Sequence, residues 1–179
     1  TYSRVRMGTK VTRRDALHLA LMSSENRMAS ALARHYPGGR SAFIRAMNNK
    51  ARQLGMRNSR FYDSTGLSTR NVSTARDLAK LITAAYRQPL IRQFTQDTNK
   101  EMRFSTPAYS LMFNNTNPLV KNPDWDVRLS KTGYTDEAGR CLLMRAKPDQ
   151  QELAIVLLNS VGKRTPVGDA NRIRKWLKS

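Results

Sequence analysis

The segment Asp126-Val-Arg-Leu-Ser-Lys-Thr132, followed by Gly133, has the short alternating apolar pattern of a β-strand. Further short apolar runs follow at residues 139–146 and 152–159, and the connections between them contain Asp, Gly and Pro. Turn residues between short apolar runs are typical of antiparallel hairpins. We therefore predict a three-stranded meander over these segments, with another strand at residues 109–113.

The sequence before residue 109 has the periodicity of amphipathic helices. Thr12 and Asp15 have the spacing of a capping box, and the apolar residues that follow share one helical face up to about Met22. Polar residues then interrupt the pattern, which predicts a junction between two helices at Ser24. On a closing helix, Trp176 is expected on the face that packs on the sheet. The predicted helices span residues 12–22, 28–36, 41–54, 73–88 and 169–178.

These patterns predict an α+β fold for the chain. A mainly helical region at about residues 8–100 precedes an antiparallel sheet and closing helix at about residues 104–179. The 179 residues, 39% of them hydrophobic, have the size of one domain with a moderate core. No segment approaches the roughly 18 consecutive apolar residues of a membrane span, so we expect no transmembrane helix.

The charge of the chain suggests a different class of function. There are 32 Lys and Arg residues against 13 Asp and Glu residues, a formal net charge of +19. A non-catalytic module that binds nucleic acid or another polyanion is therefore an alternative. However, the basic residues are spread from Arg4 to Lys178 without a like-charged run, and no helix-turn-helix, zinc-ligand set or RNA-binding motif accompanies them. The single cysteine, Cys141, excludes an internal disulfide and is expected to be buried.

Two short motifs combine side chains that could form a site. Lys131-Thr-Gly133 ends the predicted strand: the lysine supplies a point charge, the threonine a hydroxyl, and the glycine room for a substrate backbone. Ser24-Glu-Asn26 lies at the predicted helix junction, where a hydroxyl and a carboxamide could face one cleft. Each motif alone also fits a structural role, namely a solvated strand end or a helix cap.

Together, the motifs resemble the Ser-x-Asn and Lys-Thr-Gly elements of penicillin-binding proteins and related β-lactamases, in that family's order and setting. Further segments are similar to D-alanyl-D-alanine endopeptidases, the small periplasmic members of the low-molecular-mass penicillin-binding proteins. These segments are Leu21-Met-Ser-Ser-Glu-Asn-Arg27, His35-Tyr-Pro-Gly-Gly39, residues 51–56, Ser64-Thr-Gly-Leu-Ser68 and Asn71-Val-Ser-Thr-Ala-Arg-Asp-Leu78. The resemblance covers nearly the whole chain and implies a β-lactamase/DD-peptidase-like fold.

The third element of that family, Ser-x-x-Lys, is absent before Ser24. The one match, Ser160-Val-Gly-Lys163, comes after Lys131-Thr-Gly133 and follows a predicted strand, whereas the family's nucleophile begins a buried helix. The resemblance therefore implies that the nucleophilic serine and its basic lysine lie upstream of Thr1. The domain would then lack its N-terminal part, and the 179 residues alone would be inactive.

The resemblance implies a serine-type DD-peptidase that forms an acyl-enzyme and needs no metal and no cofactor. Ser24 would relay a proton to the departing amine, and Lys131 would supply the positive charge behind it. Neither His18 nor His35 has a carboxylate partner suggested by its spacing. We expect both histidines to have packing roles.

The remaining residues of the two motifs are implied to bind substrate. Asn26 would bind the peptide stem, and Lys131 and Thr132 would receive the carboxylate next to the scissile amide. Gly133 would leave room for strand addition by the stem peptide. The backbone N–H of Tyr134 would form half of an oxyanion hole.

The implied partners are peptidoglycan stem peptides and cross-links, with β-lactam antibiotics as covalent inhibitors and no nucleic acid. The implied location is the periplasm. Cleavage of cross-links by an endopeptidase is the activity that the segments favour. A D-Ala-D-Ala carboxypeptidase that uses the same motifs is the alternative within this class.

Overall fold

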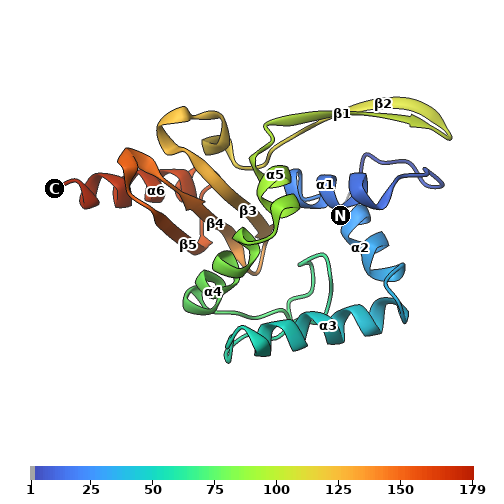
Figure 1. Cartoon of the computed structure of the whole chain (residues 1–179), viewed down its shortest axis with the longest axis horizontal. Coiled ribbons are helices and arrows are strands. Elements are labelled where there is room, and N and C mark those ends of the chain that lie inside the picture. Colours follow the sequence, from blue (N-terminus) through green and yellow to red (C-terminus); the bar gives the residue numbers. More distant parts are fainter. Residues whose placement is uncertain (1–2) are drawn as a thin grey trace.

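The computed structural model describes residues 3–179. Within them the chain forms six α-helices and five β-strands (Figure 1). The helices are α1 (Arg13–Met22), α2 (Asn26–Arg34), α3 (Gly39–Gln53), α4 (Ala75–Tyr86), α5 (Pro89–Gln96) and α6 (Thr165–Leu177). The strands are β1 (Asn99–Ser105), β2 (Ala108–Asn114), β3 (Val127–Thr135), β4 (Gly139–Ala146) and β5 (Leu153–Ser160). Short 3-10 turns lie at Pro118–Lys121, Pro123–Trp125 and Pro148–Gln150.

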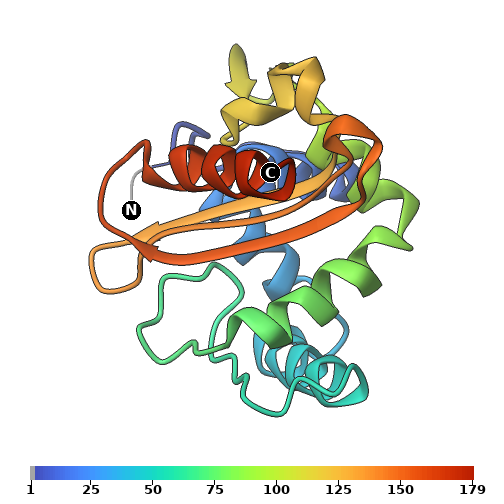
Figure 2. The ribbon, with the colours of Figure 1, turned by 90° about the vertical axis from the view of Figure 1, so that its left-hand side faces the viewer.

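The second half of the chain forms a three-stranded antiparallel sheet in the order β3-β4-β5. In its register, Gly133 of β3 lies opposite Cys141 of β4. Helix α6 lies on one face of this sheet and α4 on the other (Figure 2). The predicted meander is confirmed. In the part of the chain that is described, β3 is an edge strand, so one side of its backbone is open.

Trp125 anchors the core of the sheet region. The side chain is fully buried, its indole N–H donates a hydrogen bond to Asn171 of α6 at 3.2 Å, and the Arg174 guanidinium lies over the ring. Truncation of a buried aromatic residue of this size typically costs about 3–5 kcal/mol, so this contact fixes α6 against the sheet. The buried core around it consists of Leu119, Val127, Leu142, Met144, Ala146, Ile155 and Ala170.

The first half of the chain has its own core, which α1 and α2 share with the β1–β2 hairpin. Strands β1 and β2 pair from Asn99 and Asn114 to Ser105 and Ala108, and the hairpin extends away from the body of the molecule (Figure 1). The core residues here are Val5, Ala16, Leu19, Met22, Met28, Met102, Phe104 and Phe113.

Local sequence signals explain where two of the helices begin and end. The Thr12 hydroxyl accepts a hydrogen bond from the Asp15 N–H at 3.0 Å, as the capping box predicts. Helix α3 ends at Gln53, and Gly55 just beyond it has a φ of 71°, which glycine adopts without strain. There the N–H of Met56 reaches back to the Ala51 carbonyl at 2.9 Å, which closes the last turn in a Schellman motif.

Two elements were not predicted. The predicted fourth helix stops before Pro89, as it does in the structure, but Pro89 also occupies the first turn of α5, where its missing N–H costs nothing. Strand β1 was missed because only Met102 and Phe104 are buried in it, which is too few apolar residues for a clear alternation. The α+β class is confirmed.

The prediction for Trp176 was wrong. It shares a helical face with Ala170 by sequence, but Trp176 is 72% exposed and Ala170 is fully buried. The buried residues of the helix, Pro166 and Ala170, lie in its first two turns, and Ile173 packs against the same core, whereas Trp176 in the last turn is open to solvent. None of the helices described for residues 3–179 combines the length and the apolar character needed to cross a membrane.

Candidate active site

Ser24 occupies the turn between α1 and α2 in a left-handed conformation, with φ of 55°. This region is sparsely populated for residues other than glycine, and it costs about 1–3 kcal/mol. The Ser23 N–H and hydroxyl both bond the Leu19 carbonyl, at 3.1 and 2.9 Å, which ends α1 just before the turn. The strained turn therefore directs the Ser24 hydroxyl away from the helix and toward the sheet.

Lys131 meets Ser24 across 107 positions of sequence. Its ammonium donates a hydrogen bond to the Ser24 hydroxyl and a second one to the Thr132 carbonyl at 2.7 Å. The residue as a whole is partly exposed, but the ammonium end is enclosed by protein, and this burial lowers the pKa of Lys131 to about 8. Lys131 forms no salt bridge to a carboxylate in residues 3–179, so no opposite charge offsets the desolvation.

Thr132 is also linked to the junction between α1 and α2, through hydrogen bonds to Thr116. Its hydroxyl donates to the Thr116 hydroxyl at 2.6 Å, and the Thr116 N–H donates to the Met22 carbonyl at the end of α1 at 3.2 Å. Thr116 therefore links strand β3 to the helix that precedes Ser24. The sequence motifs gave no signal for it, because it lies between β2 and a 3-10 turn in a segment without periodicity.

The helix cap in the Ser24-Glu-Asn26 motif is its middle residue, Glu25. Glu25 is buried, and its carboxylate caps α2 by accepting a hydrogen bond from the Met28 N–H at 3.1 Å. Ser24 and Asn26 are therefore not needed as helix caps. Asn26, the first residue of α2, lines the same cavity as Lys131.

A cavity of about 1100 Å³ runs along the open side of β3. It brings together all of the residues that the motifs predicted, namely Ser24, Asn26, Lys131, Thr132, Gly133 and Tyr134. Gly133 is exposed to it, and a side chain there would make only ordinary contact with Cys141, at 3.8 Å. The glycine is thus not required by the packing of the sheet, and its absence of a side chain leaves room on the cavity side.

Other residues at this cavity were not singled out from the sequence. Thr65, Gly66 and Leu67 reach it from the segment between α3 and α4, and Lys163 and Arg164 from the segment before α6. The first three lie in the family-like segment Ser64-Thr-Gly-Leu-Ser68, but that resemblance assigned them no role, since only the fold brings these segments beside β3. The expected burial of Cys141 was also wrong, because it is only partly buried and lines the cavity.

Tyr134 borders the far end of the cavity, and its side chain is 53% exposed. Its hydroxyl donates to the Asp136 carboxylate at 2.6 Å, and the Arg140 guanidinium lies 4.2 Å from the ring centre. The hydrogen bond to Asp136 raises the pKa of Tyr134 above its ordinary value. The phenol is therefore neutral at physiological pH and serves to hold the β3–β4 hairpin.

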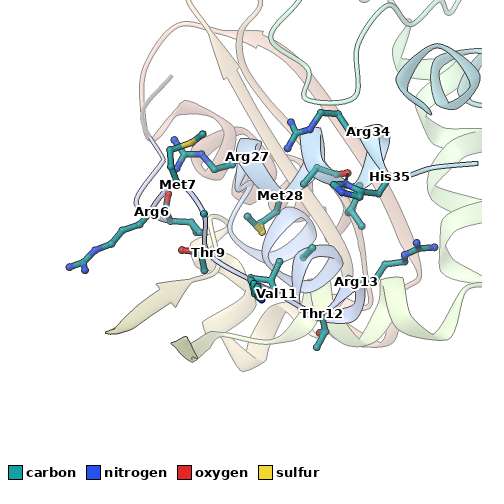
Figure 3. Close-up of a pocket in the computed structure, with 16 residues that line it drawn as sticks. Arg6, Met7, Thr9, Val11, Thr12, Arg13, Arg27, Met28, Arg34 and His35 are labelled. Atoms are coloured by element: carbon teal, nitrogen blue, oxygen red, sulfur yellow. Dashed lines mark hydrogen bonds between the residues drawn. The ribbon is translucent and has the colours of Figure 1, made fainter. Parts of the chain in front are cut away.

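A second cavity, of about 590 Å³, lies against α1 and α2 away from these residues (Figure 3). Its apolar wall includes Val11 and Met28, and the side chains of Arg6 and Arg13 extend away from each other around it (Figure 3). It contains neither of the two motifs. The cavity beside β3 is therefore the candidate active site.

The two histidines lie outside the candidate active site. His18 is buried and stacks on Phe94 with ring centres 4.2 Å apart, as expected for a packing role. Contrary to the expectation from spacing, it has a carboxylate neighbour: its Nε2 lies 2.9 Å from Asp97, although without the alignment of a hydrogen bond. Burial outweighs this neighbour and lowers the pKa of His18. His35 is exposed, and its ring bonds the Ala31 carbonyl at the end of α2.

Comparison with known proteins identifies the family. The family described as D-alanyl-D-alanine carboxypeptidase matches residues 1–162. D-alanyl-D-alanine endopeptidases of Pseudomonas aeruginosa and Escherichia coli are 50% and 51% identical to the chain over 178 residues, which is 99% of this chain and 57% of theirs. The crystal structure of a Streptomyces DD-transpeptidase superposes with a TM-score of 0.87 at 26% identity, over 97% of this chain and 70% of that one.

The chain thus spans about 57% of the length of the curated relatives that it matches. The resemblance to D-alanyl-D-alanine endopeptidases that the Ser24 and Lys131 motifs suggested is confirmed over nearly the whole chain. By sequence, by fold and by the order of its motifs, the chain belongs to the penicillin-recognising serine DD-peptidases of the D-alanyl-D-alanine carboxypeptidase family.

Proposed function

We propose that this chain is the C-terminal part of a D-Ala-D-Ala endopeptidase that hydrolyses peptidoglycan cross-links through an acyl-enzyme. The observation that carries the proposal is the hydrogen bond from the desolvated Lys131 ammonium to the Ser24 hydroxyl, at the open edge of β3. The names of the two relatives at 50% and 51% identity support the endopeptidase activity.

The nucleophile belongs, in this proposal, to a segment N-terminal to Thr1. No Ser-x-x-Lys precedes Ser24, and the curated relatives are longer than the chain. Ser160 is unsuitable, because it is the buried last residue of β5 rather than the first residue of a helix. Without that segment, the 179 residues are expected to be inactive.

Lys131 and Ser24 supply the proton chemistry. With a pKa of about 8, the lysine is about nine-tenths protonated at pH 7, yet it gives up its proton far more readily than an ordinary lysine. A proton can pass from Lys131 through the Ser24 hydroxyl to the departing amine, which then leaves as a neutral group. Two of the three ammonium N–H groups are used by Ser24 and Thr132. The third is available for a substrate carboxylate.

The other residues of the motifs bind the substrate. Asn26 bonds the backbone of the stem peptide from the α2 side, and the Thr132 hydroxyl assists Lys131 at the carboxylate. Gly133 admits the stem peptide along the open strand edge, and the Tyr134 N–H donates to the oxyanion. Stem peptides and cross-links of peptidoglycan are the proposed partners, β-lactams are the proposed covalent inhibitors, and the periplasm is the proposed location.

The first test uses the gene product that contains this chain together with its upstream segment. After incubation with benzylpenicillin, peptide mapping by mass spectrometry is expected to find the adduct on a serine upstream of Thr1, three residues before a lysine. The same protein is expected to convert cross-linked dimer muropeptides into monomers. An adduct on Ser160, or no conversion of dimers, would contradict the proposal.

A second candidate is D-Ala-D-Ala carboxypeptidase activity, which the description of the matching family favours. One cavity suits both reactions, since the carboxylate beside the scissile bond is common to a terminal D-Ala and to a cross-linked diamino acid. Release of D-Ala from monomeric pentapeptide, measured beside dimer cleavage, decides between them. A faster release than cleavage would make the carboxypeptidase the main activity.

A further inference from the structure

Residues 60–72 form a closed loop between α3 and α4. An isolated antiparallel bridge closes its base: the Arg60 N–H donates to the Val72 carbonyl at 2.9 Å, and the Val72 N–H to the Arg60 carbonyl at 3.0 Å. Within this bridge the chain forms neither helix nor strand. Apart from one backbone hydrogen bond, from the Asn71 N–H to the Ser68 carbonyl at 3.1 Å, its conformation depends on side-chain hydrogen bonds.

Asp63 supplies most of them. This carboxylate is 8% exposed and accepts hydrogen bonds from the Thr65 hydroxyl at 2.6 Å, the Gly66 N–H at 3.0 Å and the Leu67 N–H at 3.2 Å. The Asn71 carboxamide donates a fourth at 2.5 Å. Burial by itself would raise the pKa of Asp63, but these hydrogen bonds outweigh it and hold the pKa below its ordinary value.

Asn71 completes the network from the other arm of the loop. Its carbonyl oxygen accepts from the Tyr62 N–H at 2.7 Å while its amide donates to Asp63. The two arms are thereby joined through side chains near the tip as well as through the bridge at the base. Such a doubly closed loop is preorganised, so its tip keeps one position before any ligand binds.

The tip of this loop forms the wall of the candidate active site that faces β3. Thr65, Gly66 and Leu67 line the cavity together with Thr132 and Tyr134. Figure 2 shows this segment, drawn in green, beside the end of the sheet where β3 and β4 are joined. Leu67 is 41% exposed, so its apolar side chain faces the cavity and is not buried in a hydrophobic core. Gly66 has a φ of 84°, and no atom lies within 4 Å of the position that a side chain would take.

We propose that Leu67 is a specificity-determining residue that contacts an aliphatic side chain of the stem peptide bound along β3, and that Asp63 positions it. This inference rests on the proposed function and deepens it. A peptide added to the open edge of β3 has its backbone bonded on one side only. Its side chains alternate, and those that face the loop meet the apolar Leu67 instead of water.

Asp63 acts on the substrate only through the loop. It does not line the cavity, and all of its hydrogen-bond donors are loop residues. Two of these donors are the backbone N–H groups of Gly66 and Leu67. Their hydrogen bonds to Asp63 fix the backbone conformation at Leu67, the residue proposed to contact substrate. Replacement of the carboxylate by a carboxamide leaves one acceptor oxygen for donors that now use two, which weakens the network and lets the tip move away from β3.

The experiment measures KM and kcat for cleavage of a cross-linked dimer muropeptide by the whole protein. Leu67→Ala is expected to raise KM roughly tenfold with kcat almost unchanged, as for a lost apolar contact. Asp63→Asn is expected to raise KM by a similar factor. In the double variant the increase should not exceed that of the larger single effect, because Asp63 acts through Leu67. Thr65→Val, which removes one donor to Asp63, should give a smaller increase and serves if Asp63→Asn does not fold.

Matched controls separate this role from mere stability. Leu90→Ala removes a leucine of similar exposure, 37%, that does not line the cavity, and Asp77→Asn removes a buried carboxylate from another hydrogen-bond network. Both are expected to lower Tm without changing KM. KM values of Leu67→Ala and Asp63→Asn equal to wild type, or fully multiplicative effects in the double variant, would overturn the inference. If the wild-type protein binds penicillin and cleaves dimers and the variants have its KM, only this inference is overturned. An inactive wild type would refute the proposed function itself.

Discussion

Ser24 and Asp149 are two of the five residues other than glycine that have a positive φ in the described part of the chain, with φ of 55° and 53°, and they lie in different regions of the molecule. Asp149 lies in the turn between β4 and β5 and forms ion pairs with Arg174 at 2.7 Å and Lys178 at 2.8 Å. Ser24 accepts a hydrogen bond from Lys131, and within residues 3–179 this cation forms no ion pair with a carboxylate. At Asp149 the opposite charges satisfy each other, so the strained turn attaches α6. At Ser24 the Lys131 ammonium has no opposite charge to pair with in the described structure.

The pKa values express the same contrast. The hydrogen bonds from Arg174 and Lys178 lower the pKa of Asp149 far below its ordinary value, which stabilises its charged form. Burial lowers the pKa of Lys131 to about 8, which destabilises its charged form. Backbone strain by itself therefore does not identify a functional site. A strained residue beside an unpaired, desolvated charge does so with a physical reason.

The largest expected effect comes from removal of that charge. Lys131→Met in the whole protein should lower the rate of dimer cleavage by roughly a thousandfold, the range for a lost general acid. Tm should not fall, since an uncompensated buried cation is replaced by an apolar side chain of similar length. Lys131→Arg should not restore activity, because the guanidinium does not release a proton. Steady-state rates and thermal unfolding check this, and activity close to wild type would contradict it.

The second prediction tests the strained turn directly. Ser24→Gly should lower the cleavage rate roughly a hundredfold through loss of the relaying hydroxyl. It should also raise the free energy of unfolding by about 1 kcal/mol, since glycine adopts a positive φ without strain. Ser24→Ala is the matched control, which loses the hydroxyl but keeps the strain. Equal stability of the two variants would show that the turn is not strained.

The pH dependence of activity gives the third prediction. If the Lys131 ammonium donates the proton, kcat should fall as the pH rises through about 8, roughly two pH units below an ordinary lysine. For stability the sign is opposite: between pH 8 and the ordinary lysine pKa, the unfolded chain binds more protons than the folded one. Lys131 therefore contributes a rise of stability with pH in that window. Denaturant unfolding of wild type and Lys131→Met at pH 7.5 and 9.5 isolates this contribution, which should be absent from the variant.

A smaller effect is expected at Thr116. Thr116→Val removes the acceptor for the Thr132 hydroxyl and should raise KM for the dimer substrate roughly fivefold, the cost of about one hydrogen bond. Thr116→Ser keeps the hydroxyl and should retain the wild-type KM. If serine and valine behave alike, the bond between the two threonines does not position the carboxylate site.

The smallest effect on activity is expected at the other strained turn. Asp149→Asn should leave KM and kcat unchanged and lower Tm, because its two ion pairs attach the end of α6. The stabilisation belongs to the charged carboxylate, whose folded pKa is depressed. It is present above the ordinary pKa of Asp and lost as the pH falls through and below it. Since these pairs are at the surface, added salt should narrow the difference in Tm between variant and wild type.

The sequence by itself determined the α+β class, the three-stranded meander, the cap at Thr12 and the two motifs at Ser24 and Lys131. These features depend on periodicity and on short spacings, which the chain carries locally. It also determined the family, because the motifs recur in one order. The same local signals placed Pro89 correctly beyond the end of α4 but did not reveal the helix that it begins. They also misplaced Trp176, which lies in the last turn of α6 and is exposed.

Only the tertiary structure decided which residues meet. Ser24 and Lys131 are 107 positions apart, and their hydrogen bond exists because α1 ends beside the edge of β3. Thr116 and Asp63 lie in no motif, and the family-like segment Ser64-Thr-Gly-Leu-Ser68 assigned no role to Leu67. A hydroxyl, a leucine or a carboxylate in an aperiodic segment is ordinary until the fold gives it a neighbour. The lowered pKa of Lys131 has the same origin: burial is a property of the assembled fold, and no spacing in the sequence encodes it.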